Sequence, residues 1–386
     1  MSTLSKERVS RLDWAGKNVT LKTVVAEMSR LHDDITRQDM SELGHPRSRN
    51  CVVNLVITVS DEEREESAEQ VVGFLAAGHP LRAIVLHRSP SEQGGLDAEI
   101  TTEAHKLVRG TSVQREQVTL KVRGEAGEHI ASLLEPLLVS DVPTYVWWTG
   151  TPSLAETGLR EVLGVCDVLI VDSASFTNPV EAFLELAALA ERMSERMGFV
   201  DLQWARQKAW RETLAQFFAP AGRQPLLDGL ERVVVECAGM GRANRVGAAL
   251  MSGWLMSSLG WRLTSAASAS EKAAEAIVEN RNGRMVELML RSADAHSLPQ
   301  GMLCGVRFHG RKGEHPFSLQ MEIRADRSDH AHVRIDLGGE ETLHQRLPLP
   351  QAGEAQLLLH ALSAARRDGV YVRSLAAAAK LVDVLR

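Results

Sequence analysis

The most informative segment of the sequence is Leu137-Leu138-Val139-Ser140-Asp141-Val142-Pro143-Thr144-Tyr145-Val146-Trp147-Trp148-Thr149-Gly150. An apolar helix end leads into a Ser-Asp-Val-Pro turn, and the short strand that follows carries two of the chain's seven tryptophans. Successive side chains of a strand point to opposite faces, so Trp147 and Trp148 lie in different environments. Helices on both faces of a central strand would make both rings core. Alternatively, one ring anchors a partner, because aromatic residues concentrate at interface hot spots.

Buried strands alternate with helices on both sides of this segment. The continuous apolar runs at 51–59 and 167–172 are typical of strands that are covered on both faces. The charge-rich segments 96–102 and 117–122 interrupt the alternation, and they predict two consecutive antiparallel strands. The sequence therefore predicts an α/β domain over residues 45–223, built as layers around a mixed sheet.

An N-terminal region of residues 1–44 precedes this domain. Residues 1–20 are polar, and we expect an irregular arm there. Apolar residues recur at three- and four-residue spacing over 21–38, which predicts an amphipathic helix. Such a helix needs a groove for its apolar face, either in this chain or in a partner.

The second half of the chain, residues 224–386, has the pattern of an α+β domain. Pro220, Gly222 and Pro225 mark the boundary before it. The segment Ser268-Ala269-Ser270-Glu271 fits a capping box and predicts a helix that ends near Val278. Several segments between 285 and 347 alternate polar and apolar residues, as antiparallel strands with one buried face do. We therefore predict an antiparallel sheet with helices on one face.

Charge and hydropathy exclude several classes of partner. The net charge is −6, and no basic block exceeds two or three residues, which argues against nucleic acid and anionic membrane surfaces. No run approaches the ~18 apolar residues of a membrane helix. The first eight residues, Met-Ser-Thr-Leu-Ser-Lys-Glu-Arg, contain no apolar signal core, so we expect a cytoplasmic protein.

A glycine-containing turn is the first candidate for a ligand site. Gly239-x-Gly241 lies between a predicted strand and a predicted helix, which is the context of a phosphate-cradling turn. The third glycine position is Asn244, and no acidic residue follows at the spacing of a dinucleotide fold. We interpret it as an ordinary strand-to-helix turn. A phosphate site formed by Gly239, Gly241 and Arg242 remains the alternative.

The other reactive residue types form no complete set. Asp172, Ser173 and Ser175 follow a strand but lack the G-x-S-x-G geometry, and they are equally suited to capping a turn. Asp141 and Asp172 would form a carboxylate pair only if the fold brings them together. We therefore predict no catalytic residue, no metal ligand and no cofactor. The remaining candidates are His330 and His332, expected at a polar surface turn, and Cys51, Cys166, Cys237 and Cys304, expected to be reduced thiols unless distant cysteines meet in the fold.

A series of short segments carries a family resemblance. Besides the stretch 137–150, they are His45-Pro46 with the strand 52–59, Gly127-Glu128-His129-Ile130-Ala131-Ser132-Leu133-Leu134, Leu169-Ile170-Val171-Asp172-Ser173-Ala174-Ser175-Phe176, Asp201-Leu202-x-Trp204-x-Arg206 with Trp210-Arg211-Glu212, and Ala248-Ala249-Leu250-Met251-Ser252-Gly253-Trp254-Leu255 with Leu259-Gly260-Trp261. In this order they resemble the glucose-6-phosphate dehydrogenase assembly protein family, OpcA. The resemblance covers residues 45–262 and is looser toward the C-terminus.

The resemblance implies a non-catalytic protein that promotes assembly and activation of glucose-6-phosphate dehydrogenase. That enzyme is the NADP-dependent entry point of the oxidative pentose phosphate pathway. In cyanobacterial members the effect is linked to thioredoxin-type redox control, but this chain has no closely spaced cysteine pair. The candidate partner contacts are Trp147, Trp148, Trp204 and Trp210, with core packing as the other interpretation of each. The alternative function is a nucleotide- or sugar-phosphate-binding enzyme or sensor that uses the Gly239-Gly241 turn.

Overall fold

The computed structural model describes residues 7–43, 51–59, 62–76, 80–89, 92–106, 112–239, 245–270, 273–294, 298–324, 327–349, 351–363 and 366–384. The chain divides into two compact units. Unit 1 contains Met1–Val171, Arg196–Phe199 and Glu354–Arg366, and unit 2 contains Asp172–Glu195, Val200–Gly353 and Arg367–Arg386. This division differs from a contiguous split at residue 223, because helix α5 (Pro179–Met193) packs against helix α11 (Gly369–Val384) within unit 2.

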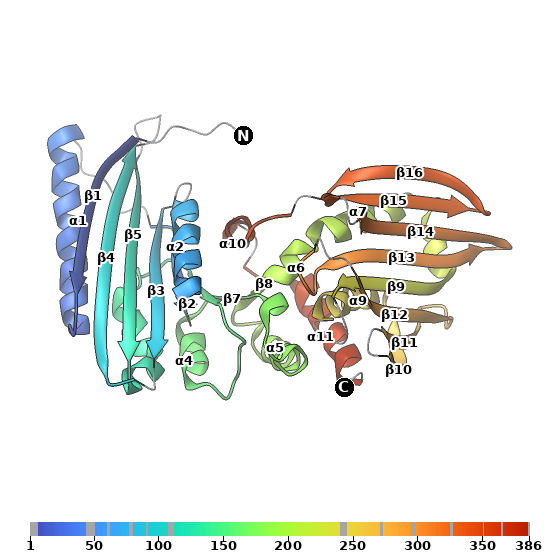
Figure 1. Cartoon of the computed structure of the whole chain (residues 1–386), viewed down its shortest axis with the longest axis horizontal. Helices are drawn as coiled ribbons and strands as arrows, with labels where there is room; N and C mark the ends of the chain where they lie inside the picture. Colours follow the sequence, from blue (N-terminus) through green and yellow to red (C-terminus); the bar gives the residue numbers. More distant parts are fainter. Residues whose placement is uncertain are drawn as a thin grey trace. The chain divides into compact units, whose positions relative to one another are not determined.

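Unit 1 is built on a mixed sheet with the strand order β1-β4-β5-β3-β2-β6-β7-β8, of which only the last two residues of β8 are assigned to unit 2 (Figure 1). The strands β5, β3, β2, β6 and β7 run parallel to one another, whereas β4 is antiparallel to both β5 and β1. This confirms the predicted mixed sheet and its antiparallel pair. The bounds are β1 Glu7–Gly16, β2 Val53–Val59, β3 Leu81–Ser89, β4 Gly95–Lys106, β5 Ser112–Arg123, β6 Thr144–Trp148, β7 Val168–Val171 and β8 Gly198–Asp201.

The predicted irregular N-terminal arm is wrong for the described residues. β1 pairs with β4, and Trp14 lies opposite Ile100 in the register. No local pattern indicates this strand, because half of its residues are polar or charged and its partner lies about 90 residues away. The helix that follows is confirmed as α1 (Leu21–Leu43), whose buried stripe contains Val24, Met28, Leu31 and Ile35.

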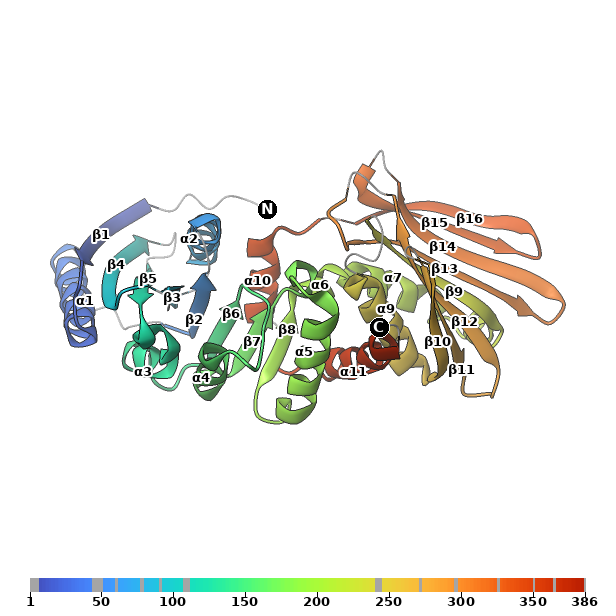
Figure 2. The same ribbon diagram turned by 60° about the horizontal axis from the view of Figure 1, so that its bottom comes forward.

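Helices cover both faces of the parallel part of this sheet. Figure 2 shows α2 (Glu62–Ala76) and α10 (Glu354–Ser363) on one side, and α3 (Ile130–Leu134) and α4 (Thr157–Val165) on the other. α2 and α10 are joined by Glu354, which accepts a hydrogen bond from Ser67 Oγ at 2.8 Å and pairs with Arg64. Because both faces are covered, all seven residues of β2 and all five of β6 are buried.

Unit 2 is built on a second sheet with the order β10-β11-β12-β9-β13-β14-β15-β16. Every neighbouring pair is antiparallel except β12 with β9. The helix α9 (Val246–Leu259) packs on β9 and β12, which agrees with the predicted α+β arrangement. The strand bounds are β9 Leu230–Ala238, β10 Arg262–Ser270, β11 Ala273–Glu279, β12 Met285–Ala293, β13 Leu303–Lys312, β14 His315–Arg324, β15 Arg327–Leu337 and β16 Glu340–Pro348. The remaining helices are α6 Leu202–Arg206, α7 Lys208–Phe218, α8 Gln224–Asp228 and α9 Val246–Leu259.

The helix predicted from the capping box at 268–271 is wrong. The segment forms the end of β10 and all of β11, while Glu271 lies outside the described residues. Ala274, Ala276 and Val278 are buried and their neighbours are less so, which is the period of a strand. Alanine and serine fit either structure locally, so pairing with β12 decides the outcome.

No helix within the described ranges combines the length and the apolar character that crossing a membrane requires.

Candidate functional site

Both rings of the Trp-Trp strand lie inside unit 1. The exposed fraction is 1% for Trp147 and 2% for Trp148. The Arg88 guanidinium lies 4.8 Å from the centroid of the Trp148 ring, and Arg88 is also paired with Glu156 at 2.5 Å. The indole Nε1 of Trp147 is buried and finds no hydrogen-bond acceptor among the described residues. The folded chain thus buries both rings.

The other two candidate tryptophans are buried in unit 2. Trp204 on α6 is 7% exposed, and Trp210 on α7 is 3% exposed. Trp204 donates through Nε1 to Asp368 Oδ2 at 3.0 Å, and the Arg211 guanidinium stacks 3.3 Å from its ring centroid. Such stacking contributes ~0.5–2 kcal/mol depending on desolvation. Burial lowers the pKa of Arg211 to about 10, which leaves the guanidinium charged at neutral pH.

A polar cluster surrounds Trp204, and its centre is the carboxylate of Asp201. Asp201 is fully buried and caps α6 by accepting a hydrogen bond from Gln203 N at 2.9 Å. It also accepts hydrogen bonds from Ser173 N at 3.0 Å and Ser173 Oγ at 2.7 Å. The Tyr371 hydroxyl lies 3.5 Å away, at the start of α11. One carboxylate therefore holds three segments of unit 2 together.

Asp172, which follows β7, forms an ion pair with Arg206 in the same cluster. Its two oxygens accept from Nη1 and Nη2 of Arg206 at 2.7 Å each, a bidentate geometry. Asp172 Oδ1 also caps the turn by accepting from Ala174 N at 3.2 Å, and Ser175 Oγ donates to the Asp172 carbonyl. The strand-end hydroxyls and carboxylates are thus committed to positioning the backbone. Three residues of this cluster, Asp172, Ser173 and Ser175, were considered as reactive candidates from their residue types. Asp201 and Arg206 were noted only as part of the motif that resembles the family.

Among the residues that the structure describes, the remaining candidates form no reactive set. Asp141 has a φ of 64°, and the Asp172 carboxylate pairs with Arg206. Gly239 follows β9 with a φ of 147°, but Gly241, Arg242 and Asn244 lie outside the described residues, as does His45-Pro46. His332 is 6% exposed, while His330 lies 2.9 Å from Asp329. Across the described ranges, no three His, Cys, Asp or Glu side chains are grouped as metal ligands would be.

The four cysteines are free thiols. Cys237 on β9 and Cys304 on β13 are buried on neighbouring strands, where Cys237 lies opposite Leu303 in the register. Burial raises the pKa of Cys304 to about 12 and that of Cys237 far above its ordinary range. Both thiols are therefore protonated and unreactive at neutral pH, since the thiolate is the nucleophile.

The buried Asp201 should make stability depend on pH. Burial raises its pKa from the ordinary 3.8 to about 6, so the folded state binds a proton more tightly than the unfolded state. The resulting stabilisation is fully present below about pH 4 and is lost as the pH rises through about 6, a change of ~3 kcal/mol. We expect the unfolding free energy of the wild type, minus that of Asp201→Asn, to fall between pH 4 and 7. Urea unfolding at several pH values measures it, and parallel pH curves for the two proteins would contradict the assignment.

Two protein-family models match consecutive stretches of this chain. A family model described as the glucose-6-phosphate dehydrogenase subunit N-terminal domain matches residues 74–188. A second, described as the C-terminal domain of the same subunit, matches residues 197–375. The first spans β3 to α5, including the Trp-Trp strand, and the second includes Asp201, Trp204 and Gly253.

Curated relatives and solved structures extend the comparison. A protein of Synechocystis sp. with the provisional name OxPP cycle protein OpcA is 30% identical over half of this chain and 39% of its own length. The same-named protein of Nostoc punctiforme is 28% identical over half of this chain and 41% of its own length. The matches thus span about two fifths of these longer relatives.

Among solved structures, a mutant of KijD10, a 3-ketoreductase from Actinomadura kijaniata crystallised with TDP-benzene and NADP, matches with a TM-score of 0.50. Its sequence is 14% identical, and the match covers 87% of this chain and 97% of that one, so the likeness shows a shared fold. The two consecutive domain models and the same-named relatives give the family: this chain belongs to the OpcA family of glucose-6-phosphate dehydrogenase assembly proteins.

Proposed function

We propose that the chain is a non-catalytic assembly factor that binds glucose-6-phosphate dehydrogenase in the cytoplasm and favours its active oligomer. The observation that carries the proposal is the pair of consecutive family models, both described as domains of a subunit of this dehydrogenase. The names of the relatives, which place them in the OxPP cycle, support the same pathway.

The sequence that joins β2 to α2 supports a role other than dinucleotide chemistry. In dinucleotide-binding folds a glycine-rich turn follows the first parallel strand, and the pyrophosphate lies at the N-terminus of the next helix. Here the parallel strand β2 is followed in sequence by Ser60-Asp61-Glu62-Glu63, without a glycine. The sequence between β2 and α2 therefore lacks the glycine-rich turn of a dinucleotide site.

Differential binding is the mechanism that such a factor requires. A protein that binds the active oligomer more tightly than the other states shifts the population toward that oligomer. A tenfold shift needs only about 1.4 kcal/mol of differential affinity. The chain can thus activate the dehydrogenase without contributing a residue to the reaction.

The proposal is tested with the purified cognate dehydrogenase. We expect the chain to raise its rate of NADP reduction and to shift it to a larger species in size-exclusion chromatography with light scattering. The controls are the heat-unfolded chain and an unrelated protein at the same concentration. An unchanged rate together with no complex at micromolar concentrations would refute the proposal. NADP-dependent turnover of a sugar phosphate by the chain alone would favour an enzyme instead.

Partner contact by Trp147, Trp148, Trp204 or Trp210 stays a hypothesis within this proposal. All four rings are less than 9% exposed, so a contact would require the chain to rearrange locally. Phenylalanine replacements separate the two roles, because they keep most of the buried ring area. A variant that folds with wild-type stability but no longer activates the dehydrogenase would identify a contact.

A further inference from the structure

Four strands lie at the edges of the two sheets, and β10 is the least protected of them. An edge strand presents unpaired backbone N–H and C=O groups, which native proteins shield with charged side chains, proline or a very short strand. β1 and β16 carry charged side chains, β16 also ends in proline, and β8 has four residues. After Arg262, β10 consists of Leu, Thr, Ser and Ala alone. Its composition therefore gives it none of these protections.

The outer edge of β10 is open where the strand is most regular. Figure 1 shows β10 at the end of the second sheet, beside α11, and its neighbour in the sheet is β11. The register with β11 shifts on either side of Ser265–Ser268 and is regular between them. Within the described ranges, the backbone of this stretch has no hydrogen-bond partner outside β11. At the far end of the strand, Arg245 Nη2 donates to the Ser270 carbonyl at 3.4 Å.

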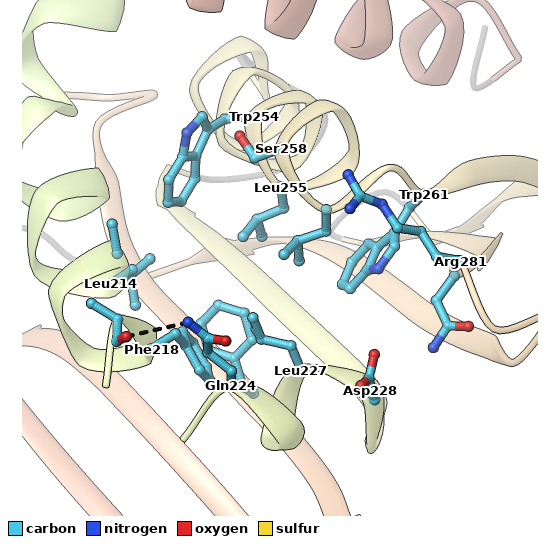
Figure 3. Close-up of a pocket in the computed structure, with 15 residues that line it drawn as sticks. Leu214, Phe218, Gln224, Leu227, Asp228, Trp254, Leu255, Ser258, Trp261 and Arg281 are labelled. Atoms are coloured by element: carbon cyan, nitrogen blue, oxygen red, sulfur yellow. Dashed lines mark hydrogen bonds between the residues drawn. The ribbon is translucent and has the colours of Figure 1, made fainter. Parts of the chain in front are cut away.

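A groove of about 580 Å³ lies beside the first residues of β10, between this strand and α11. Its apolar lining includes Met256, Leu263 and Val384, and Val384 is 53% exposed. Trp261 forms another part of the lining. This ring also lines the pocket between α7, α8 and α9, where Figure 3 shows it beside Arg281. Because Trp261 is 8% exposed, it is a fixed wall of the groove rather than a mobile surface side chain.

The charged side chains of this groove are mostly cations. Arg262, Arg373 and Lys380 line it together with one carboxylate, that of Asp383. Arg262 pairs with Glu279, its neighbour on β11. Arg373 and Lys380 are exposed, and neither has a hydrogen-bond or ion-pair partner among the residues that the structure describes. Since the whole chain has a net charge of −6, the groove is a local basic site on an acidic protein, and its charge complements an acidic partner.

We propose that β10 and this groove bind an extended acidic segment of a partner protein, which adds to the sheet as a further strand. The backbone of the segment pairs with Ser265–Ser268, the strand-addition mode of peptide recognition. Every second side chain of the segment points to the helix face of the sheet. An apolar side chain there enters the groove beside Leu263, and neighbouring carboxylates pair with Arg373 and Lys380. Binding is measured on the chain alone, so its failure is distinguishable from that of the assembly function.

The test is isothermal titration of the purified full chain with synthetic peptides that are acetylated and amidated at their ends. The acidic peptide is Thr-Glu-Thr-Val-Thr-Glu-Thr, in which both Glu and the Val share one face of an extended strand. A second peptide has Lys in place of Glu. A third keeps the acidic sequence but is N-methylated at its central Thr-Val-Thr, which removes backbone donors on both edges.

The protein variants separate the charge of the groove from charge elsewhere. The double variant Arg373→Met, Lys380→Met removes both unpaired cations and keeps most of their apolar stems. Arg346→Met, on the opposite edge strand β16, is the control, because Arg346 is an equally exposed cation outside the groove. Circular dichroism and thermal unfolding of each variant without peptide confirm that it is folded.

We expect saturable one-to-one binding of the acidic peptide, with slower amide hydrogen exchange at Ser265–Ser268 in the complex. The Lys peptide and the N-methylated peptide should each bind at least tenfold more weakly, about 1.4 kcal/mol. The double variant should lose at least tenfold in affinity for the acidic peptide, whereas Arg346→Met should stay within twofold of the wild type.

The proposal is overturned if the acidic peptide does not bind saturably or if the double variant binds it as tightly as the wild type. Equal affinity for the N-methylated peptide would also overturn it, because charge attraction without strand addition then explains the binding. Light scattering of the chain alone tests a second copy as the occupant. A dimer that Ala267→Lys disrupts, but that Ala15→Lys on the β1 edge leaves intact, would assign the β10 edge to self-association instead.

Discussion

Gly253→Ala should destabilise unit 2 by about 3 kcal/mol or more, although the same substitution in an ordinary helix stabilises by about 1 kcal/mol. Gly253 lies in α9 where α11 passes at close range. A Cβ at this position would be 2.2 Å from Ser374 O, 2.7 Å from Ala378 N and 2.8 Å from Ala378 Cβ. The first two of these are backbone atoms, so the clash is relieved only by moving one helix. Real Cβ atoms essentially never approach other atoms under 3.0 Å.

The control for this prediction is Gly164→Ala in α4. A Cβ there meets no atom within 4 Å, so we expect a gain of about 0.5–1 kcal/mol from the lower entropy of the unfolded chain. Urea unfolding followed by tryptophan fluorescence measures both variants, and amide hydrogen exchange in α9 and α11 locates the loss. Equal behaviour of the two variants would show that α9 and α11 are not packed through Gly253.

Elements with a strong local pattern were predictable from the sequence. The runs of β2 and β7 are buried on both faces and carry few polar residues, so their pattern has one structural interpretation. The helix α1 was equally clear from its apolar stripe. In contrast, β1 and β11 depend on distant partner strands, and neither polar residues nor alternating alanines specify a strand without the neighbour.

The candidate site was less predictable than the fold. The Asp201 carboxylate, Ser173 and Tyr371 meet although 28 and 170 residues separate them, and no local spacing encodes such a meeting. Sequence periodicity predicts which residues are buried, whereas the polar partners within the core follow from tertiary contacts.

Trp147→Ala should destabilise unit 1 by about 3–5 kcal/mol, the cost of emptying a large aromatic site in a core. The ring is 1% exposed and sits in a strand paired on both sides, with β2 and β7, so the surrounding backbone has little freedom to collapse. Urea unfolding of the full chain measures the loss.

Trp147→Phe is the variant that distinguishes packing from the polar end of the ring. It keeps an aromatic ring but removes the indole N–H, which has no acceptor among the residues described. Burying an unpaired donor costs ~1–3 kcal/mol of folding free energy. That gain offsets part of the lost volume, so we expect a net cost below ~1.5 kcal/mol. Trp148→Phe should cost more, because it weakens the stacking with the Arg88 guanidinium and removes no buried unmatched donor. If Trp147→Phe instead destabilises the chain as much as Trp147→Ala, the indole N–H of Trp147 has an acceptor in the folded chain, and the expected difference between Trp147 and Trp148 is wrong.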